Sequence, residues 1–288
     1  MVKKICLPMY SNKIRKATYD CNYSHFIRYA GLADIPIQLV YPETNIVWAP
    51  RNACHTSISV NDKQLVVDFS DKQDEGLKRF DEYPKYAKVQ YHEGICTREK
   101  YPRLYPSMPV PDIRNYTLLK HFFSMVENGP VYTANGDVVI CPQRPHTRAL
   151  DRRTMVHAIL KRAYGSNADI ELTDQRTFWE RHKSCLVAIV VPGATEHIFD
   201  RGHIEQLALG VCTISTRIDT NLCYWKKLVD GEHFIQCKND FSDLLDKIEW
   251  ARDHRNECKE IGTNARKLFL DYLAPKPFMN WLAQIVEE

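Results

Sequence analysis

The stretch DRGHIEQLALGVCTIST, residues 200–216, carries two charged residues whose spacing fits a ligand site. Arg201 and Glu205 are four residues apart, so on a helix they lie on one face. Ile204 and Leu207 fall on another face, where they can pack against a sheet. This pattern predicts either a surface ion pair or a ligand site at the mouth of a parallel sheet.

Two segments concentrate basic residues in a chain whose formal net charge is only +3. Residues 1–16 contain lysines and arginines but no acid. A second basic segment, residues 144–153, holds Arg144, Arg148, Arg152 and Arg153 against the single acid Asp151. The net charge by itself does not indicate a nucleic-acid binder, but local patches indicate that anionic groups bind at defined places.

Composition narrows the class of protein. With 288 residues, 44% of them hydrophobic and 26% charged, the chain can bury a core and reads as a soluble globular protein. No apolar run approaches the roughly 20 residues that a membrane span needs, and the first residues lack a signal peptide, so we expect a cytoplasmic protein. The ten cysteines form no CxxC pair, which argues against a zinc site and predicts reduced, buried thiols.

The N-terminal half alternates apolar runs with polar loops, which is typical of an α/β layer structure. A helix is predicted at SHFIRYAGL, and strands are predicted at KKICLPMY, IPIQLVYP, KQLVVDFS and YAKVQYHEG. The segment YPRLYPSMPVPDIRNYT has four prolines, which exclude a helix interior or a central strand. We expect a surface connection there, with a domain boundary behind it that separates residues 1–128 from residues 129–288.

The C-terminal half repeats the alternation more clearly. Strands are predicted at DVVICPQ, ADIEL, CLVAIVVPG and VCTIST, with helices between them and two amphipathic helices at the end. Continuous apolar strands separated by helices belong to parallel sheets covered on both faces. The predicted fold class is therefore α/β, with two Rossmann-like domains in series. In such sheets ligands bind beyond the carboxyl ends of the strands, where Arg201 begins a helix.

The C-terminal half resembles the nucleotide-sugar domain of GT-B glycosyltransferases, in particular the spore-maturation families and the capsule-associated and protein O-glucosyltransferase families. An Arg four residues before a Glu opens the donor helix in those families, and a small residue with Gly ends it, as in DRGHIEQLALG. A short strand and a later helix with "DL" and "I" follow, as in VCTIST and DFSDLLDKIEW. The resemblance covers about residues 140–285, and the N-terminal half only in architecture. It implies GT-B architecture, in which two Rossmann-like domains face a cleft and terminal helices pack back on the first domain.

The resemblance implies roles for three residues of the donor helix. Glu205 would accept hydrogen bonds from the ribose hydroxyls of a nucleotide sugar, and Arg201 would offer a planar donor fork to its diphosphate. His203 would either contact the donor or cap the first turn. Many GT-B enzymes carry a second Glu eight positions earlier, where this chain has His197, with Glu196 one residue off. The stereochemical outcome therefore stays open.

The loop CPQRPHTRALDRR follows the first strand of the second half, where GT-B folds place a diphosphate-binding loop. Arg144 and Arg148 would neutralise the charge that develops on the leaving diphosphate, a role that Mg²⁺ otherwise fills. The alternative is a solvated helix start with Asp151 as the partner. Because no Asp-x-Asp motif ends a strand, we expect metal-independent chemistry, with the nucleotide sugar as co-substrate and no cofactor.

The acceptor side needs a general base, which the first domain supplies in inverting GT-B enzymes. Asp68 and Glu93 stand at the ends of predicted strands, where they would face the cleft. Their rivals are Asp20, Asp71, His25 and His92. For each of these residues the alternative is a helix cap or a polar group satisfied within its loop.

The leading hypothesis is a glycosyltransferase that moves a sugar from a nucleotide-diphosphate sugar, most simply a UDP-sugar, to a hydroxyl. The acceptor stays open between a glycan, a lipid-linked glycan, a protein and a hydroxymethylated base in DNA. Two other functions remain: a non-catalytic nucleic-acid-binding α/β protein that uses the basic patches, and a two-domain isomerase of nucleotide sugars.

Overall fold

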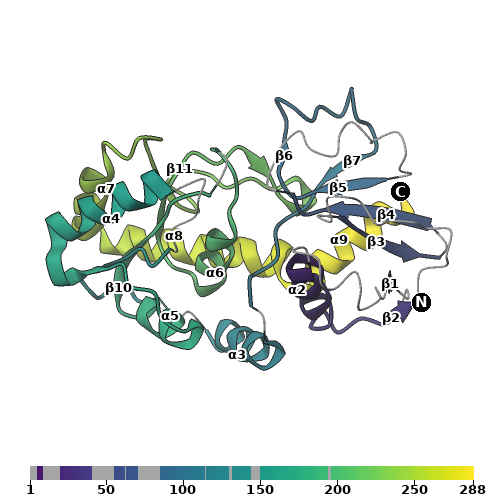
Figure 1. The fold of residues 1–288 in the computed structure, drawn as a ribbon, viewed down its shortest axis with the longest axis horizontal. Coiled ribbons are helices and arrows are strands. Elements are labelled where there is room, and N and C mark those ends of the chain that lie inside the picture. The colour runs from purple at the N-terminus through teal and green to yellow at the C-terminus, as the bar shows by residue number, and fades with distance from the viewer. Residues whose placement is uncertain are drawn as a thin grey trace. The chain divides into compact units, whose positions relative to one another are not determined.

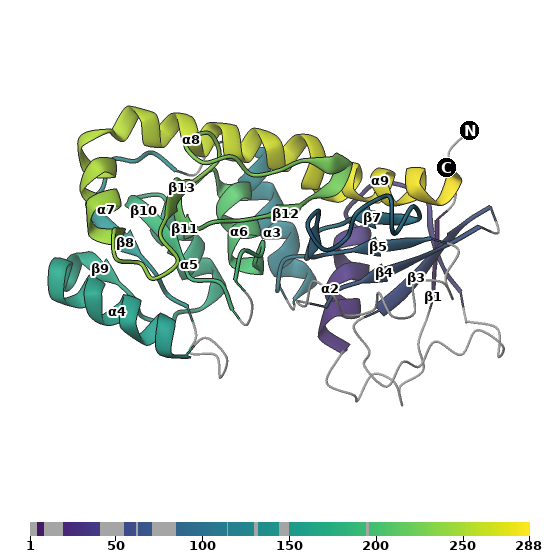
Figure 2. The same ribbon diagram turned by 90° about the horizontal axis from the view of Figure 1, so that it is seen from above.

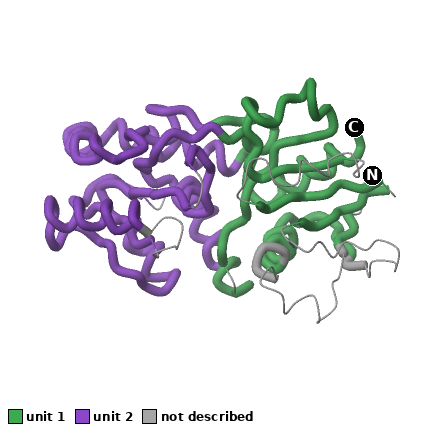
Figure 3. The backbone as a smooth tube through the Cα atoms, turned by 45° about the horizontal axis from the view of Figure 1, so that its top comes forward, with its two compact units in different colours: residues 1–120, 220–227, 271–288 green, residues 121–219, 228–270 purple. Residues whose placement is uncertain are grey.

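The computed structural model describes residues 5–8, 20–40, 55–61, 63–70, 85–113, 115–129, 132–143, 150–193 and 196–288. Contacts divide the chain into two compact units, each drawn from segments that are distant in the sequence (Figure 3). Unit 1 comprises Met1–Lys120, Thr220–Lys227 and Asp271–Glu288, and unit 2 comprises His121–Asp219 and Leu228–Leu270. The predicted boundary after residue 128 stays a prediction.

Unit 1 is built on a mixed sheet. Its described elements are β1 (Ile5–Pro8), α2 (Asp20–Ala30), β2 (Ile37–Val40), β3 (His55–Val60), β4 (Lys63–Asp68), β5 (Tyr86–Lys88), β6 (Tyr91–His92), β7 (Leu104–Pro106), β12 (Thr220–Asn221), the 3-10 turn η3 (Cys223–Trp225) and α9 (Pro275–Glu287). The six-stranded sheet has the order β2-β1-β3-β4-β5-β7 (Figure 2). β3 is antiparallel to both of its neighbours, and the other pairs are parallel. β6 and β12 form a separate antiparallel pair.

The proline-rich segment of unit 1 is part of the core, so the prediction of a surface connection is wrong. β7 lies inside it and pairs with β5, and the chain beyond the strand stays buried at Met108, Val110 and Ile113. The physical reason is that β7 is an edge strand. An edge strand needs hydrogen bonds on one side only, so it tolerates proline, while the apolar residues between the prolines pack inward.

The last helix of the chain, α9, belongs to the core of unit 1. Pro275 opens it, at a position where the missing N–H costs nothing. Phe278, Leu282 and Ile285 share a buried face of the helix, which packs against β3 and β4. The indole N–H of Trp281 donates to the carbonyl of Pro106 at 2.8 Å, so α9 also fixes the end of β7.

Unit 2 is built on a fully parallel sheet. Its described elements are β8 (Val138–Ile140), α4 (Leu150–Tyr164), the 3-10 turn η2 (Gly165–Asn167), β9 (Ala168–Asp169), α5 (Gln175–His182), β10 (Cys185–Val190), α6 (Arg201–Leu209), β11 (Thr213–Thr216), β13 (Ile235–Cys237), α7 (Leu244–Asp253) and α8 (Arg255–Leu268). Two boundaries between the units along the chain fall within helical segments, α3 (Tyr116–Glu127) and the π-helical η4 (Phe269–Leu273). The strand order is β13-β11-β10-β8-β9, and α4 and α7 lie on one side of the sheet with α5 on the other (Figure 1).

The strand order of unit 2 fixes where a ligand would bind. From β8 the chain moves outward to β9, then returns to β10 and continues to β11 and β13 on the other side. This is the doubly wound order 2-1-3-4-5, and its switch point lies between β8 and β10. In such sheets ligands bind beyond the carboxyl ends of the strands at the switch point.

The coarse expectations from the sequence are met. The fold is α/β with parallel sheet, as predicted. The eight cysteines whose side chains the structure describes are free, and all of them except Cys6 are buried. In the part of the chain that the structure describes, no helix has both the length and the apolar composition to cross a membrane.

Candidate functional site

The candidate site is the carboxyl edge of unit 2 at the switch point, where segments after β8 and β10 meet the first turn of α6. Gln143, just beyond β8, accepts a hydrogen bond from the backbone N–H of Val191 at 2.6 Å. Gly202 in the first turn of α6 comes so close that an added Cβ would lie 3.3 Å from both Gln143 and Val190. The glycine therefore lets the helix begin directly against the end of β10.

Two arginines of α4 hold the segment after β10. Arg152 donates from Nη2 to the carbonyl of Gly193 at 2.9 Å, and its Nη1 lies 3.5 Å from the Glu196 carboxylate. Arg153 donates from Nε and Nη2 to the carbonyl of Val191 at 3.3 and 3.1 Å, and its guanidinium lies 3.7 Å from the Asp200 carboxylate. Burial lowers the pKa of Arg153, and the charge of Asp200 opposes that shift. Two guanidinium groups are thus fixed at the switch point, a chemistry that suits phosphate.

A capping box starts α6. In it the Asp200 side chain faces the backbone N–H of His203, and Nδ1 of His203 accepts from the N–H of Asp200 at 2.9 Å. The Asp200 carboxylate also accepts from the N–H of Gly193 at 2.9 Å. With Nδ1 as an acceptor, Nε2 carries the proton and donates to Ser215 Oγ at 2.9 Å, which donates to the carbonyl of Val190 at 3.0 Å. Burial lowers the pKa of His203 to about 4, so the ring is neutral at pH 7.

His203 is therefore the cap of the first turn, one of its two predicted roles. Its side chain is buried, and the two ring nitrogens are used inside the protein. The other predicted role, a contact with the donor, stays a prediction.

Glu205 lies one turn further along α6 and is half-buried. Its Oε2 accepts a hydrogen bond from the indole N–H of Trp179 at 2.7 Å. Trp179 comes from α5 and is fully buried, with its ring 4.9 Å from that of Phe122. Glu205 thus links α5 to α6, and its predicted contact with a ribose stays a prediction. Arg201 is the first residue of α6 and lies at the carboxyl edge itself.

Two predicted donor ligands, Arg144 and Arg148, lie outside the described residues. The residues that flank their loop, Gln143 and Arg152, both belong to the carboxyl edge. Among the described residues, no group of three His, Cys, Asp or Glu side chains could hold a metal ion.

In unit 1, Asp68 ends β4 and lies at the carboxyl end of the strand, as predicted. His55, Asp68 and Lys88 are register partners across β3, β4 and β5, so their side chains share one face of the sheet. The Asp68 carboxylate accepts from Lys88 Nζ at 2.8 Å, from the Tyr86 hydroxyl at 2.8 Å and from the N–H of Ser70 at 2.7 Å. These five residues are called the Asp68 cluster below.

The Asp68 cluster is closed to solvent at its centre. The side chains of Asp68 and Lys88 are both fully buried. Burial opposes ionisation of Asp68, but the charge of Lys88 and the hydrogen bond from His55 outweigh it and hold the pKa of Asp68 well below its usual range. A carboxylate held in this way takes up a proton poorly, and an acceptor hydroxyl has no direct path to it. This geometry does not favour the predicted role of Asp68 as the direct base.

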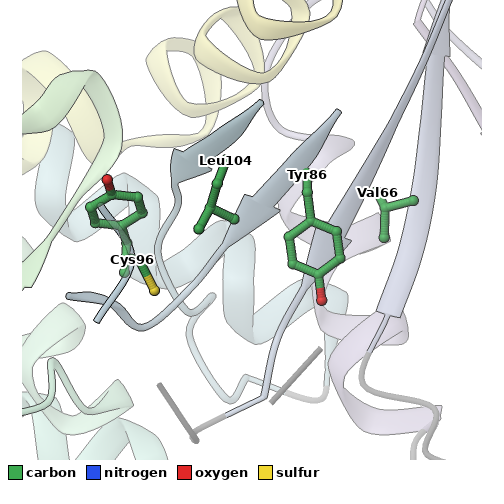
Figure 4. Close-up of a cluster of buried hydrophobic side chains, with 5 residues drawn as sticks. Val66, Tyr86, Cys96 and Leu104 are labelled. Carbon is green, nitrogen blue, oxygen red and sulfur yellow. The ribbon is translucent and has the colours of Figure 1, made fainter. Parts of the chain in front are cut away.

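His55 is the member of the Asp68 cluster nearest to solvent. Its side chain is 13% exposed, its Nε2 lies 2.8 Å from the Tyr86 hydroxyl, and it is 3.6 Å from the Asp68 carboxylate. The Tyr86 ring packs in an apolar row with Val66 and Leu104, which closes the cluster on that side (Figure 4). Nothing in the sequence singles out His55, Tyr86 and Lys88, because no local pattern indicates which strands pair.

The other predicted bases have different surroundings. Glu93 is 58% exposed and accepts from Lys227 Nζ at 2.7 Å and from Asn221 Nδ2 at 2.8 Å, bonds that lower its pKa. His25 is buried, 3.2 Å from Asp112, and His92 accepts from the N–H of Gly94 at 3.1 Å. Each of these three residues has a polar partner within unit 1, and their predicted catalytic roles stay predictions. Asp71 lies outside the described residues, and Asp20 begins α2.

Comparison with known proteins finds similarity in short stretches. No family model matches the chain. The chain is 28% identical over 98 residues to the uncharacterized protein 179R of invertebrate iridescent virus 6, which covers 30% of this chain and 8% of that protein. It is 44% identical over 39 residues to protein O-glucosyltransferase 2 of Danio rerio, covering 14% of this chain and 8% of that enzyme. It is 26% identical over 65 residues to protein O-glucosyltransferase 3 of Homo sapiens, covering 23% of this chain and 13% of that enzyme. The chain thus matches only a small part of the length of these relatives, and part of it is similar to glucosyltransferases.

Proposed function

We propose that the protein is a glycosyltransferase of GT-B architecture that binds a nucleotide-diphosphate sugar, most simply a UDP-sugar, at the carboxyl edge of unit 2. The observation that carries this proposal is the switch point between β8 and β10, where Arg152 and Arg153 are fixed beside the first turn of α6. The local similarity to protein O-glucosyltransferases supports the same reaction class.

The charges at this edge suit the diphosphate of a donor. Guanidinium groups match phosphate oxygens in geometry, and the N-terminus of α6 adds the favourable end of its helix dipole. In the transfer, the acceptor oxygen bonds to the anomeric carbon while the bond from that carbon to the diphosphate breaks. Arg144, Arg148 and Arg201 would stabilise the negative charge on the leaving diphosphate, so the reaction needs no metal ion.

A base must accept the proton of the acceptor hydroxyl, and a residue of unit 1 serves as that base. The Asp68 cluster favours a route in which His55 accepts the proton and Asp68 acts through Tyr86 and His55 as a positioning residue. Glu93 is the second choice. The acceptor is a hydroxyl of a glycan or a protein, or of a hydroxymethylated base in DNA.

A thermal-shift panel of nucleotides and nucleotide sugars tests the proposal. A ligand at about 100 times its dissociation constant stabilises a protein by about 2.7 kcal/mol, which gives a clear shift. We expect stabilisation by UDP and a UDP-sugar, followed by slow release of free sugar from the donor. A nucleic-acid-binding protein would instead show no nucleotide response and DNA binding that weakens steeply with salt, a result that would overturn the proposal.

A further inference from the structure

Unit 2 has a pocket at the opposite edge of its sheet, lined by apolar surface and by several polar side chains. The pocket holds about 430 Å³ and lies where the loop before β8 and the end of α6 face α8. Its lining includes Thr133, Asn135, Gly210, Lys259, Thr263 and Arg266. Residues that precede β8 and β11 mark the amino ends of these parallel strands, so the pocket is separate from the carboxyl edge.

The lining of this pocket is cationic. Lys259, Thr263 and Arg266 are spaced at i, i+4 and i+7, so they share one face of α8. The lining contains no carboxylate, and within the described chain neither Lys259 nor Arg266 has an ion-pair partner. By contrast Arg255, one turn before Lys259, forms an ion pair with Asp137.

Arg266 is held in place while its charge lacks a counterion among the described residues. Its Nη2 donates to the carbonyl of Val126 near the end of α3, and its Nε is buried without a described hydrogen-bond partner. Burial lowers the pKa of this guanidinium. Because a half-buried cation without a counterion is costly, an anion in the pocket would stabilise it.

The hydroxyl groups of the pocket define the rest of the ligand. Thr133 Oγ1 donates to the carbonyl of Lys183 at 2.9 Å, and Thr263 Oγ1 donates to the carbonyl of Lys259 at 2.8 Å. Each hydroxyl proton is thereby used, so toward the pocket these oxygens can only accept. The pocket therefore offers cationic hydrogen-bond donors on Lys259 and Arg266 and hydroxyl oxygens on Thr133 and Thr263 that can accept hydrogen bonds.

We propose that this pocket binds a small polyhydroxylated anion, with its charged group on Lys259 and Arg266 and its hydroxyls donating to Thr133 and Thr263. The volume suits a monosaccharide that carries a phosphate or a carboxylate. The site goes beyond the proposed transferase reaction and does not depend on it, because it lies at the other edge of the sheet.

Isothermal titration with glucose 6-phosphate, glucuronate and inorganic phosphate tests this site on the full chain. We expect saturable binding of at least one of the two sugar anions, with inorganic phosphate weaker by about tenfold because it lacks the carbon-bound hydroxyls. Lys259→Gln should weaken binding by about tenfold, and Thr263→Val should weaken it less. Lys267→Gln is the matched control, since Lys267 is an exposed lysine of α8 outside the pocket.

Two results would overturn this proposal. One is the absence of binding by any of the three probes to the folded wild-type protein. The other is an equal loss of affinity in Lys259→Gln and Lys267→Gln, which would indicate a general charge effect. Equal affinity for the two sugar anions would support the site and show that it recognises a negative charge together with hydroxyl groups. Preference for one of them would show whether the ligand's charged group is a phosphate or a carboxylate. Absence of UDP binding would not affect these titrations, so they fail independently of the proposed function.

Discussion

The Asp68 cluster of unit 1 and the carboxyl edge of unit 2 place charged side chains at the same structural position, the carboxyl ends of neighbouring parallel strands. In unit 1, Asp68 and Lys88 are fully buried and neutralise each other. In unit 2, Arg152 and Arg153 keep 23% and 11% of their side-chain surface exposed, donate to backbone carbonyls and lie 3.5 and 3.7 Å from the partly exposed carboxylates of Glu196 and Asp200. A charge pair that is fully buried stabilises or strains the fold, whereas partly exposed guanidinium groups in longer ion pairs are still able to attract an anion.

The largest effect should follow from breaking the buried pair. Lys88→Met leaves the Asp68 carboxylate buried without its cation, so we expect the free energy of unfolding to fall by about 3–5 kcal/mol. Lys227→Met is the matched control, since its pair with Glu93 is exposed and should contribute less than about 1 kcal/mol. Urea unfolding curves of both variants check this. Similar losses of unfolding free energy in the two variants would contradict the claim that the buried Asp68–Lys88 pair differs in kind from an exposed pair.

The next effect concerns Glu205 on α6. If Glu205 holds the ribose, Glu205→Ala should weaken UDP binding by about 1.5–3 kcal/mol, the value of a charge-assisted hydrogen bond. Trp179→Phe removes the hydrogen bond to Glu205 but keeps the carboxylate, so UDP affinity should change little. Titration calorimetry with both variants separates the two roles. If Glu205→Ala loses stability but keeps its affinity for UDP, Glu205 only links α5 to α6.

Acid should affect unit 2 before it affects the Asp68 cluster. Burial lowers the folded pKa of His203 to about 4, below the unfolded value of about 6.5. Its contribution to stability is therefore complete above pH 6.5 and is lost as the pH falls toward 4, with about 2 kcal/mol gone at pH 5. His182, with a pKa also lowered to about 4 by burial, adds to the same window.

The pKa of Asp68 is also lowered, but from an ordinary carboxyl value of about 4, so its contribution to stability is lost only as the pH falls below about 4. Urea unfolding at pH 7, 5 and 3.5 checks this order. In His203→Asn the loss between pH 7 and pH 5 should shrink by about half, because His182 still titrates. An unchanged loss in this variant would show that His203 is not buried as a neutral ring.

The smallest expected effect is that of a chelator. If arginines stabilise the leaving diphosphate, turnover should be the same with and without EDTA. If turnover is lost completely in EDTA and Mg²⁺ or Mn²⁺ restores it, then Arg144, Arg148 and Arg201 are not the groups that stabilise the leaving diphosphate.

Local patterns predicted those parts of the fold that local chemistry determines. The apolar run Cys185–Val190 is a buried parallel strand, and Arg201 opens a helix, both as predicted. β3 was missed because its residues, HTSISV, are mostly small and polar, and only alternate ones are buried. β7 was missed because prolines surround it.

The contacts that define the two charged regions depend on tertiary pairing. Lys88 meets Asp68 only because β4 and β5 pair in parallel at that register. Arg153 meets Val191 across 38 residues of sequence. A basic segment was visible near residue 150, but its partners follow from the order of β8 and β10 in the sheet. Sequence spacing therefore indicated which charges gather at the edge without indicating what holds them.

The most direct test is titration of UDP-glucose into wild-type protein, Arg152→Gln and Arg162→Gln. Arg152 lies at the switch point, and Arg162 is an exposed arginine near the other end of the same helix. We predict saturable binding to the wild type, affinity lower by about tenfold in Arg152→Gln, and unchanged affinity in Arg162→Gln. Absence of binding to the folded wild-type protein, or equal affinity in all three proteins, would contradict a donor site at the carboxyl edge of unit 2.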